Sequence, residues 1–126
     1  MTLPLYRGVD KKIDLTIRDN APPHNPIPIS TFAGIVVYVD VDGRIIAKYS
    51  LNAKPGFDPI TIVDDPNGVI QILLQKKDTK SSPLGIVSFE TKVSVTDVDF
   101  DDGDADDVYR AAATRMLDAE SRLTEP

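Results

Sequence analysis

Residues 87–96 read Val-Ser-Phe-Glu-Thr-Lys-Val-Ser-Val-Thr, a stretch in which apolar and polar residues alternate. Its apolar set is Val87, Phe89, Val93 and Val95. Residues 12–18 repeat the pattern, with an apolar set of Ile13, Leu15 and Ile17. Because successive side chains of a strand point to opposite faces, a period of two residues indicates a β-strand with one buried face.

Similar stretches recur along the chain, separated by Gly, Asn, Asp and Pro. No long helical stripe occurs before residue 105. The chain is therefore predicted to be an all-β, antiparallel sandwich or barrel of about seven or eight strands. The predicted strands up to this point are 3–7, 11–18, 32–40, 44–51, 60–64, 69–75 and 86–96, with one short helical turn within 76–82. The predicted core is Ile13, Leu15, Ile17, Ile35, Val37, Val39, Ile62, Ile72, Leu74, Phe89 and Val93.

The segment 107–118 fits two patterns. A helix would place Val108, Ala112 and Met116 on one face, and three consecutive alanines favour it by propensity. A strand would also fit, because a second set of residues lies at alternate positions: Tyr109, Ala111, Ala113, Arg115 and Leu117. We predict a strand, since an open sandwich needs a final strand to close its sheet, and keep the helix as the alternative.

Two of the strands, 32–40 and 44–51, are joined across Val41-Asp42-Gly43. We predict a three-residue loop with Gly43 at positive φ, which pairs Val39 with Ile45. A two-residue turn would place the inward-facing residues of the second strand on the wrong side.

A second hairpin is predicted at Asp65-Pro66-Asn67-Gly68, between strands 60–64 and 69–75. Pro suits the first central position of a turn, and Gly accepts the positive φ that follows. Asp64 and Asp65 are therefore explained by turn formation rather than by acid–base chemistry.

The length of 126 residues fits one domain, 1–126, with a core over about 3–118 and a short tail at 119–126. The absence of cysteine excludes a disulfide framework, thiolate catalysis and zinc sites built on sulfur. A net charge of -6 disfavours nucleic acid or an anionic membrane as partner. The first seven residues lack signal-peptide features and the longest apolar run, 32–39, is too short to span a membrane, so we expect a soluble, unprocessed chain.

Residues 97–107 form a very acidic segment, which raises the question of calcium binding because hard cations take several carboxylates. The spacing differs from that of an EF-hand: counted from Asp97, the glycine falls one place late and position twelve is Val108 instead of Glu. We therefore predict a solvated acidic loop and no metal ligands, with calcium binding as the alternative.

No catalytic or cofactor-binding residues are predicted. His24 is the only histidine and lies among prolines in the loop 20–28, where a triad or metal site would need all its other members from elsewhere. Ser81, Ser82 and Ser88 are in no Gly-x-Ser-x-Gly elbow. Gly8, Gly34 and Gly56 form no phosphate-binding run, so no cofactor is expected.

Several segments carry a family resemblance in their order along the chain. They are Tyr6-Arg7-Gly8, residues 60–70, Asp78-Thr79-Lys80 with Leu84-Gly85, residues 87–93, and residues 108–113. Together they resemble the immunoglobulin-like β-sandwich modules of tailed-phage baseplates and tail-fibre attachments, of the baseplate-upper-protein amino-terminal type. The resemblance implies a structural module that holds receptor-binding proteins or fibres to the particle and has no enzymatic activity.

Two functional hypotheses follow. In the first, the chain is a non-enzymatic component of a tailed phage or prophage particle, made in the host bacterial cytoplasm and located in the virion. It would act as an assembly or adaptor module for other tail or baseplate proteins in an oligomeric particle, through one or both of the loops 20–28 and 97–107. In the alternative, it is an immunoglobulin-like binding module for a surface glycan or protein, with calcium held by the acidic loop.

Overall fold

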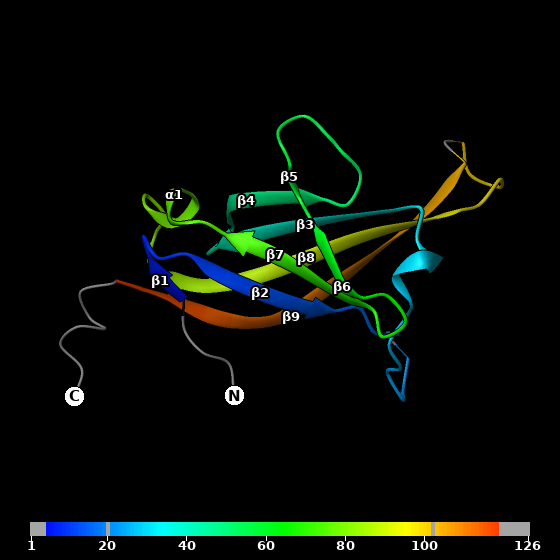
Figure 1. Ribbon diagram of the computed structural model, residues 1–126, viewed down its shortest axis with the longest axis horizontal. Helices are drawn as coiled ribbons and strands as arrows, with labels where there is room; N and C mark the ends of the chain where they lie inside the picture. Colours follow the sequence, from blue (N-terminus) through cyan, green and yellow to red (C-terminus); the bar gives the residue numbers. More distant parts are fainter. Residues whose placement is uncertain (1–4, 20, 102, 119–126) are drawn as a thin grey trace.

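The computed structural model describes residues 5–19, 21–101 and 103–118 (Figure 1). The predicted tail at 119–126 and the first two residues of the predicted strand 3–7 lie outside the described residues. The strands are β1 (Leu5–Arg7), β2 (Lys11–Thr16), β3 (Gly34–Val41), β4 (Arg44–Ser50), β5 (Asp58–Pro59), β6 (Thr61–Asp64), β7 (Val69–Leu74), β8 (Gly85–Thr96) and β9 (Asp104–Asp118). Two short helical turns are η1 (Ile29–Thr31) and α1 (Lys76–Thr79).

The strands form two sheets, which confirms the predicted all-β sandwich. One sheet has six strands in the order β1-β9-β8-β3-β4-β5, and the other has three in the order β2-β7-β6. Most pairings are antiparallel, whereas β1 with β9 and β4 with β5 are parallel. The short β5, which was not predicted, brings the number of strands in the described chain to nine.

This strand order can be compared with that of a variable-type immunoglobulin domain, which is also a sandwich of two sheets. The three-stranded sheet takes the places of strands B-E-D, and β9-β8-β3-β4 takes the places of G-F-C-C′. β5 lies at the edge where C″ would lie, but it pairs parallel to β4, unlike C″. In antibody domains a disulfide and a Trp occupy the space between the sheets. This chain has neither Cys nor Trp, and aliphatic side chains with Tyr49 and Phe89 fill its core instead.

The core residues come from the inward faces of both sheets, as the alternating pattern predicts. Nine of the eleven predicted core residues are buried. Ile13 is half-buried at the edge of the core. The prediction is wrong for Ile62, which is 45% exposed because its strand β6 lies at the edge of the smaller sheet. Tyr49 of β4 links the sheets, since its hydroxyl donates a hydrogen bond to the Leu73 carbonyl of β7 at 2.9 Å.

The predicted three-residue loop between β3 and β4 is wrong. Asp42 and Gly43 both have positive φ, 49° and 87°, and form a two-residue turn of type I′ between the paired residues Val41 and Arg44. Asp40 then pairs with Ile45, while Val39 pairs with Ala47. The intervening Ile46 is the extra residue of a β-bulge. This bulge places Ala47 and Tyr49 on the core face. The three-residue loop had been predicted in order to explain that inward orientation.

The other local predictions agree with the structure. Gly68 has a φ of 69° and its N–H donates to the Asp65 carbonyl at 3.0 Å, which closes the predicted turn. The predicted helical turn is α1. The segment 107–118 belongs to strand β9, so the predicted strand is confirmed and the alternative helix is wrong. β9 lies between β1 and β8 in the six-stranded sheet.

Candidate interaction surface

Three connections between strands lie at one end of the sandwich, called here the loop end: residues 17–33, the turn 65–68 and the loop 97–103. Hydrogen bonds join their bases, from the Ile17 N–H to the Gly68 carbonyl at 2.9 Å and from the Ala33 N–H to the Ser94 carbonyl at 2.7 Å. In Figure 1 the connections extend to the right of the sheets, opposite α1. In variable immunoglobulin domains, the corresponding connections between strands B and C and between F and G carry the binding loops.

The proline-rich connection 17–33 leaves the sandwich and returns along itself. Arg18 and Pro26 form an antiparallel bridge, and the Asp19 N–H donates to the Asn25 carbonyl at 2.8 Å. The Ile27 N–H then donates to the Ile17 carbonyl at 2.9 Å. This proline-rich connection therefore has a defined ladder at its base, although its prolines cannot donate to it.

Asp65 holds the second half of the same connection. Its carbonyl accepts the Ile29 N–H at 3.0 Å, and its carboxylate accepts the Ser30 N–H at 3.0 Å. Ile29 itself is buried in the core. Gly68 lies so close to this connection that a Cβ there would meet the Ile27 carbonyl oxygen at 2.5 Å. The residue types at Asp65 and Gly68 predicted a local turn. The contacts of these two residues with the proline-rich connection could not be predicted from the sequence, because that connection is distant along the chain.

His24 lies at the exposed tip of the proline-rich connection, with a φ of 59°. Its Nδ1 is 3.0 Å from the Asp19 carbonyl oxygen, to which it donates in the tautomer protonated at that nitrogen. Among the described residues, His24 belongs to no group of His, Asp and Glu side chains that could hold a metal. The contact of His24 thus stabilises its own loop.

The acidic segment divides into a loop and a strand. β8 continues to Thr96 and β9 begins at Asp104, so the connection is 97–103 instead of the predicted 97–107. The Asp97 N–H donates to the Gly103 carbonyl at 2.8 Å, and the Gly103 N–H donates to the Phe100 carbonyl at 2.9 Å. The Asp97 carboxylate accepts the Asp99 N–H at 3.0 Å. Hydrogen bonds within the loop therefore give it a compact hairpin conformation.

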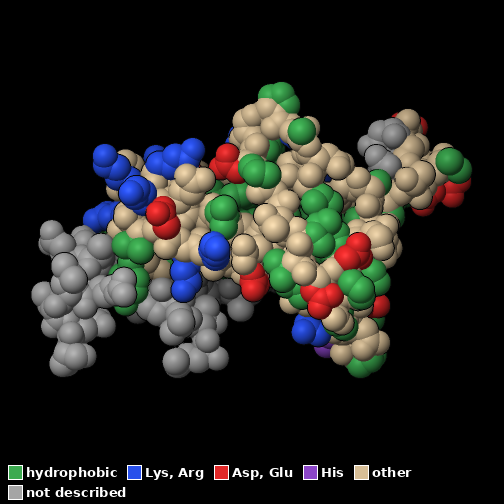
Figure 2. All heavy atoms as spheres, in the orientation of Figure 1, with side chains coloured by type: hydrophobic (Ala, Val, Ile, Leu, Met, Phe, Trp, Pro, Cys, Tyr) green, Lys and Arg blue, Asp and Glu red, His purple; other side chains and the backbone are tan. Residues whose placement is uncertain are grey.

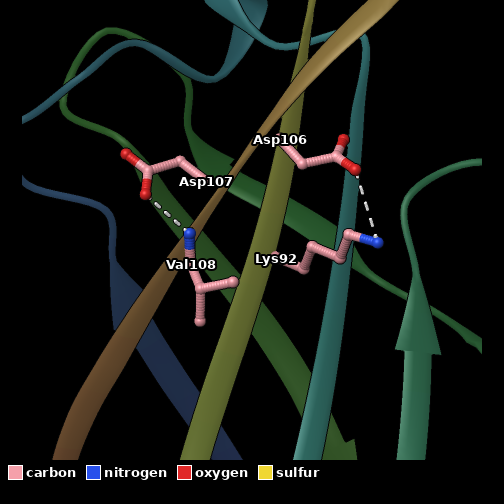
Figure 3. A network of polar contacts seen from close by, with 4 residues as sticks. All are labelled: Lys92, Asp106, Asp107 and Val108. Atoms are coloured by element: carbon pink, nitrogen blue, oxygen red, sulfur yellow. Dashed lines mark hydrogen bonds and ion pairs between the residues drawn. The ribbon is translucent and has the colours of Figure 1, made fainter. Parts of the chain in front are cut away.

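The aspartates of β9 that carry described side chains point away from one another. Figure 3 shows Asp106 and Asp107 on opposite sides of the ribbon, as expected for neighbours in a strand. Asp106 lies 3.5 Å from the Lys92 amine, and the Asp107 carboxylate accepts the Val108 N–H at 2.8 Å. Within the described part of the chain, no carboxylates gather into a group that could hold a metal ion.

A shallow groove of about 280 Å³ lies on the outer face of the six-stranded sheet, beside the Lys92–Asp106 pair. Its lining includes Gly34, Tyr38, Asn52 and Lys54. The Tyr38 ring meets the Phe57 ring edge-on at 6.1 Å, and the Lys48 and Lys54 amines lie over Phe57 at 4.9 and 4.7 Å. This groove was not predicted from the sequence, because its residues come from four strands and the β4–β5 connection.

A scan against protein-family models and searches of curated proteins and of solved structures found no match to this chain. None of the helices in the described residues has the length and apolar character needed to cross a membrane.

Proposed function

We propose that this chain is a non-enzymatic assembly module of a tailed phage or prophage particle, where it binds another tail or baseplate protein through the loop end. On this proposal the chain is made in the host bacterial cytoplasm and resides in the virion. The resemblance of the turn and strand segments to baseplate modules is the reason for proposing a location in a phage particle. The geometry of the loop end motivates the mode of binding.

The observation that carries the proposal is the hydrogen bonding of the proline-rich connection to Asp65. Binding costs conformational entropy when a loop must be ordered at the interface, so a loop that is already fixed binds with less loss. Here Ile29 and Ser30 are held by one residue of a turn from another part of the chain. Loops carried on a rigid scaffold are a common place for recognition.

A second candidate function is a free-standing module that binds a surface glycan. The groove over Gly34 favours it, because the groove combines an aromatic ring from Tyr38 with polar groups of Asn52, Lys92 and Asp106. Sites for small ligands similarly combine apolar surface with a few placed polar groups. This candidate uses the outer face of the sheet instead of the loop end.

Replacement of loops distinguishes the two candidates. One variant carries a Gly-Ser linker of equal length at 20–24, and a second carries one at 98–102. Both keep the base contacts of Asp19, Asp65, Asp97 and Gly103. A matched third variant carries the linker at 53–56, in the wall of the groove. All three are expected to keep the β-sheet signal in circular dichroism.

The readout is incorporation of the variant into particles of a strain that lacks the native chain. We expect incorporation to fall with the linker at 20–24, at 98–102 or at both, and to remain normal with the linker at 53–56. Normal incorporation of both loop-end variants would reject the loop end as the docking surface. Glycan binding that is lost only with the linker at 53–56 would support the second candidate.

A further inference from the structure

Charge is distributed unevenly between the two ends of the sandwich. Figure 2 shows Lys and Arg side chains gathered at the end that carries α1, and Asp side chains at the tip of the opposite end. The basic end includes the starts of β2 and β4 and the helical turn α1 with the residue after it, which carry Lys11, Lys12, Arg44, Lys76, Lys77 and Lys80. Asp10, Asp42 and Asp78 lie in or beside the same elements. The β8–β9 loop carries Asp97, Asp99 and Asp101. The two ends therefore have complementary charge.

The β8–β9 loop also exposes two apolar side chains at its tip. Val98 is 87% exposed and Phe100 is 54% exposed, and each lies between aspartates in the sequence. Aromatic side chains on a defined surface are frequent anchors of protein interfaces, where charged residues at the rim surround an apolar centre. The tip thus has the composition of an interface element.

A hollow at the basic end has the matching composition. It has a volume of about 410 Å³ and is lined by Asp10, Lys11, Lys12, Leu73, Leu74 and Gln75. Leu73 is 42% exposed and provides apolar surface, while the two lysines are exposed at the rim. Pockets that take small ligands start at about 300 Å³, so an aromatic side chain can be accommodated.

We propose that the β8–β9 loop of one copy docks into the Lys11–Lys12–Leu73 hollow of a second copy. Phe100 would contact Leu73, and the aspartates of the loop would face the two lysines. This inference rests on the proposed function in using the loop end as a docking surface, and it names a second copy of the chain as one partner. Because loop and hollow lie at opposite ends, the contact is head-to-tail and generates rings or open filaments.

The purified full chain provides the test, by analytical ultracentrifugation at low and high salt. We expect association that grows with protein concentration and weakens as salt rises, because the charges involved are exposed and screened. Phe100→Ala should weaken association by about tenfold or more, as loss of an interface anchor does. Phe100 is exposed, and its replacement should leave the melting temperature unchanged.

Charge reversal identifies the contact itself. One variant carries Asp99→Lys with Asp101→Lys, and the other carries Lys11→Glu with Lys12→Glu. Each alone should remain monomeric, because the substituted residues and the residues that they would face across the contact then carry the same sign. An equimolar mixture of the two should associate again, since each loop then meets a hollow of opposite sign. The control, Lys48→Glu with Lys54→Glu, changes the net charge as the Lys11→Glu with Lys12→Glu variant does. It alters neither the loop nor the hollow and should associate as the native chain does.

Native protein that stays monomeric at low salt would overturn the inference, and so would association that survives both reversals. A mixture that fails to associate would likewise reject the loop-to-hollow contact. Failure of this inference can be distinguished from failure of the proposed function, because incorporation into particles through another tail protein is measured in a separate experiment. Incorporation with a strictly monomeric chain would mean that the loop binds only a different protein.

Discussion

The Ile29 backbone N–H donates a hydrogen bond of 3.0 Å to the carbonyl oxygen of Asp65, and so ties the proline-rich connection to the β6–β7 turn. The Asp65 carboxylate adds a second bond, from the Ser30 N–H at 3.0 Å. One residue of the turn between two strands of the smaller sheet thereby fixes a segment that leads into the larger sheet. The proline-rich connection and the β6–β7 turn are consequently one structural unit instead of two independent loops.

Asp65→Ala should loosen this unit without unfolding the protein. It removes the acceptor for the Ser30 N–H and should cost about 1 kcal/mol of stability. Hydrogen exchange at Ser30 should accelerate about tenfold, because local opening becomes easier. Asp65→Asn keeps an oxygen acceptor and should retain most of the protection. Equal exchange rates in Asp65→Ala and the native chain would show that the carboxylate contributes nothing to the loop.

Gly68→Ala should be more damaging. The residue has a φ of 69°, and its Cβ would come within 2.5 Å of the Ile27 carbonyl oxygen and 2.9 Å of the Ile17 carbonyl oxygen. Backbone strain and collision together should cost about 3 kcal/mol in urea unfolding. The control is Gly56→Ala, with a φ of 81° but open space around its Cβ, which should cost only about 1 kcal/mol. Equal losses would mean that the close approach at Gly68 is relieved at no cost.

Gly43→Val tests the type I′ turn. Both turn residues have positive φ, which a β-branched side chain adopts only with strain. We expect a loss of about 2 kcal/mol in unfolding free energy. Gly43→Asn should lose less than half of that, since Asn tolerates the left-handed region. An Asn variant as unstable as the Val variant would point to a requirement other than backbone conformation.

Tyr49 should make stability fall in alkali. Burial, reinforced by the negative charges of Asp78 and Asp58, raises the pKa of Tyr49 well above its ordinary value. A raised pKa means that the folded state holds the proton more tightly, so this contribution is complete below the unfolded pKa of about 10 and declines above it. Urea unfolding at about pH 8 and about pH 11 measures the decline.

Tyr49→Phe is the matched control for this pH dependence. It removes the hydrogen bond to the Leu73 carbonyl, so it should cost about 1 kcal/mol near neutral pH. It should also flatten the alkaline decline relative to the native chain. An identical decline in both proteins would assign the effect to other groups.

The sequence predicted the strands well where alternation was strong. β2, β8 and the burial of Val37 and Phe89 follow from the period of two residues, because one face of each sheet is covered by the other. The bulge at Ile46 was not predicted, since inserting one residue leaves no compositional mark when its neighbours are also apolar. Ile62 illustrates the same limit: its alternation is correct, but its exposure depends on the position of β6 at a sheet edge.

The candidate site was predicted only in part. The two loops stand out by composition, as proline-rich and aspartate-rich segments. Their common location depends on strand order, which is set by contacts between residues far apart in the chain. The role of Asp65 and the hollow beside Leu73 could not be predicted for the same reason. Both depend on which strands are neighbours, and the alternating pattern does not give the order of the strands.

The central claim, that the chain is a structural component of a particle, is tested most directly by its distribution in a density gradient. Particles induced from a host that encodes the chain would be purified, and the chain would be quantified by mass spectrometry against the major tail proteins. The account predicts a fixed number of copies per particle, with little of the chain in the soluble fractions. Recovery of the chain only in the soluble fractions, with intact particles lacking it, would contradict the account.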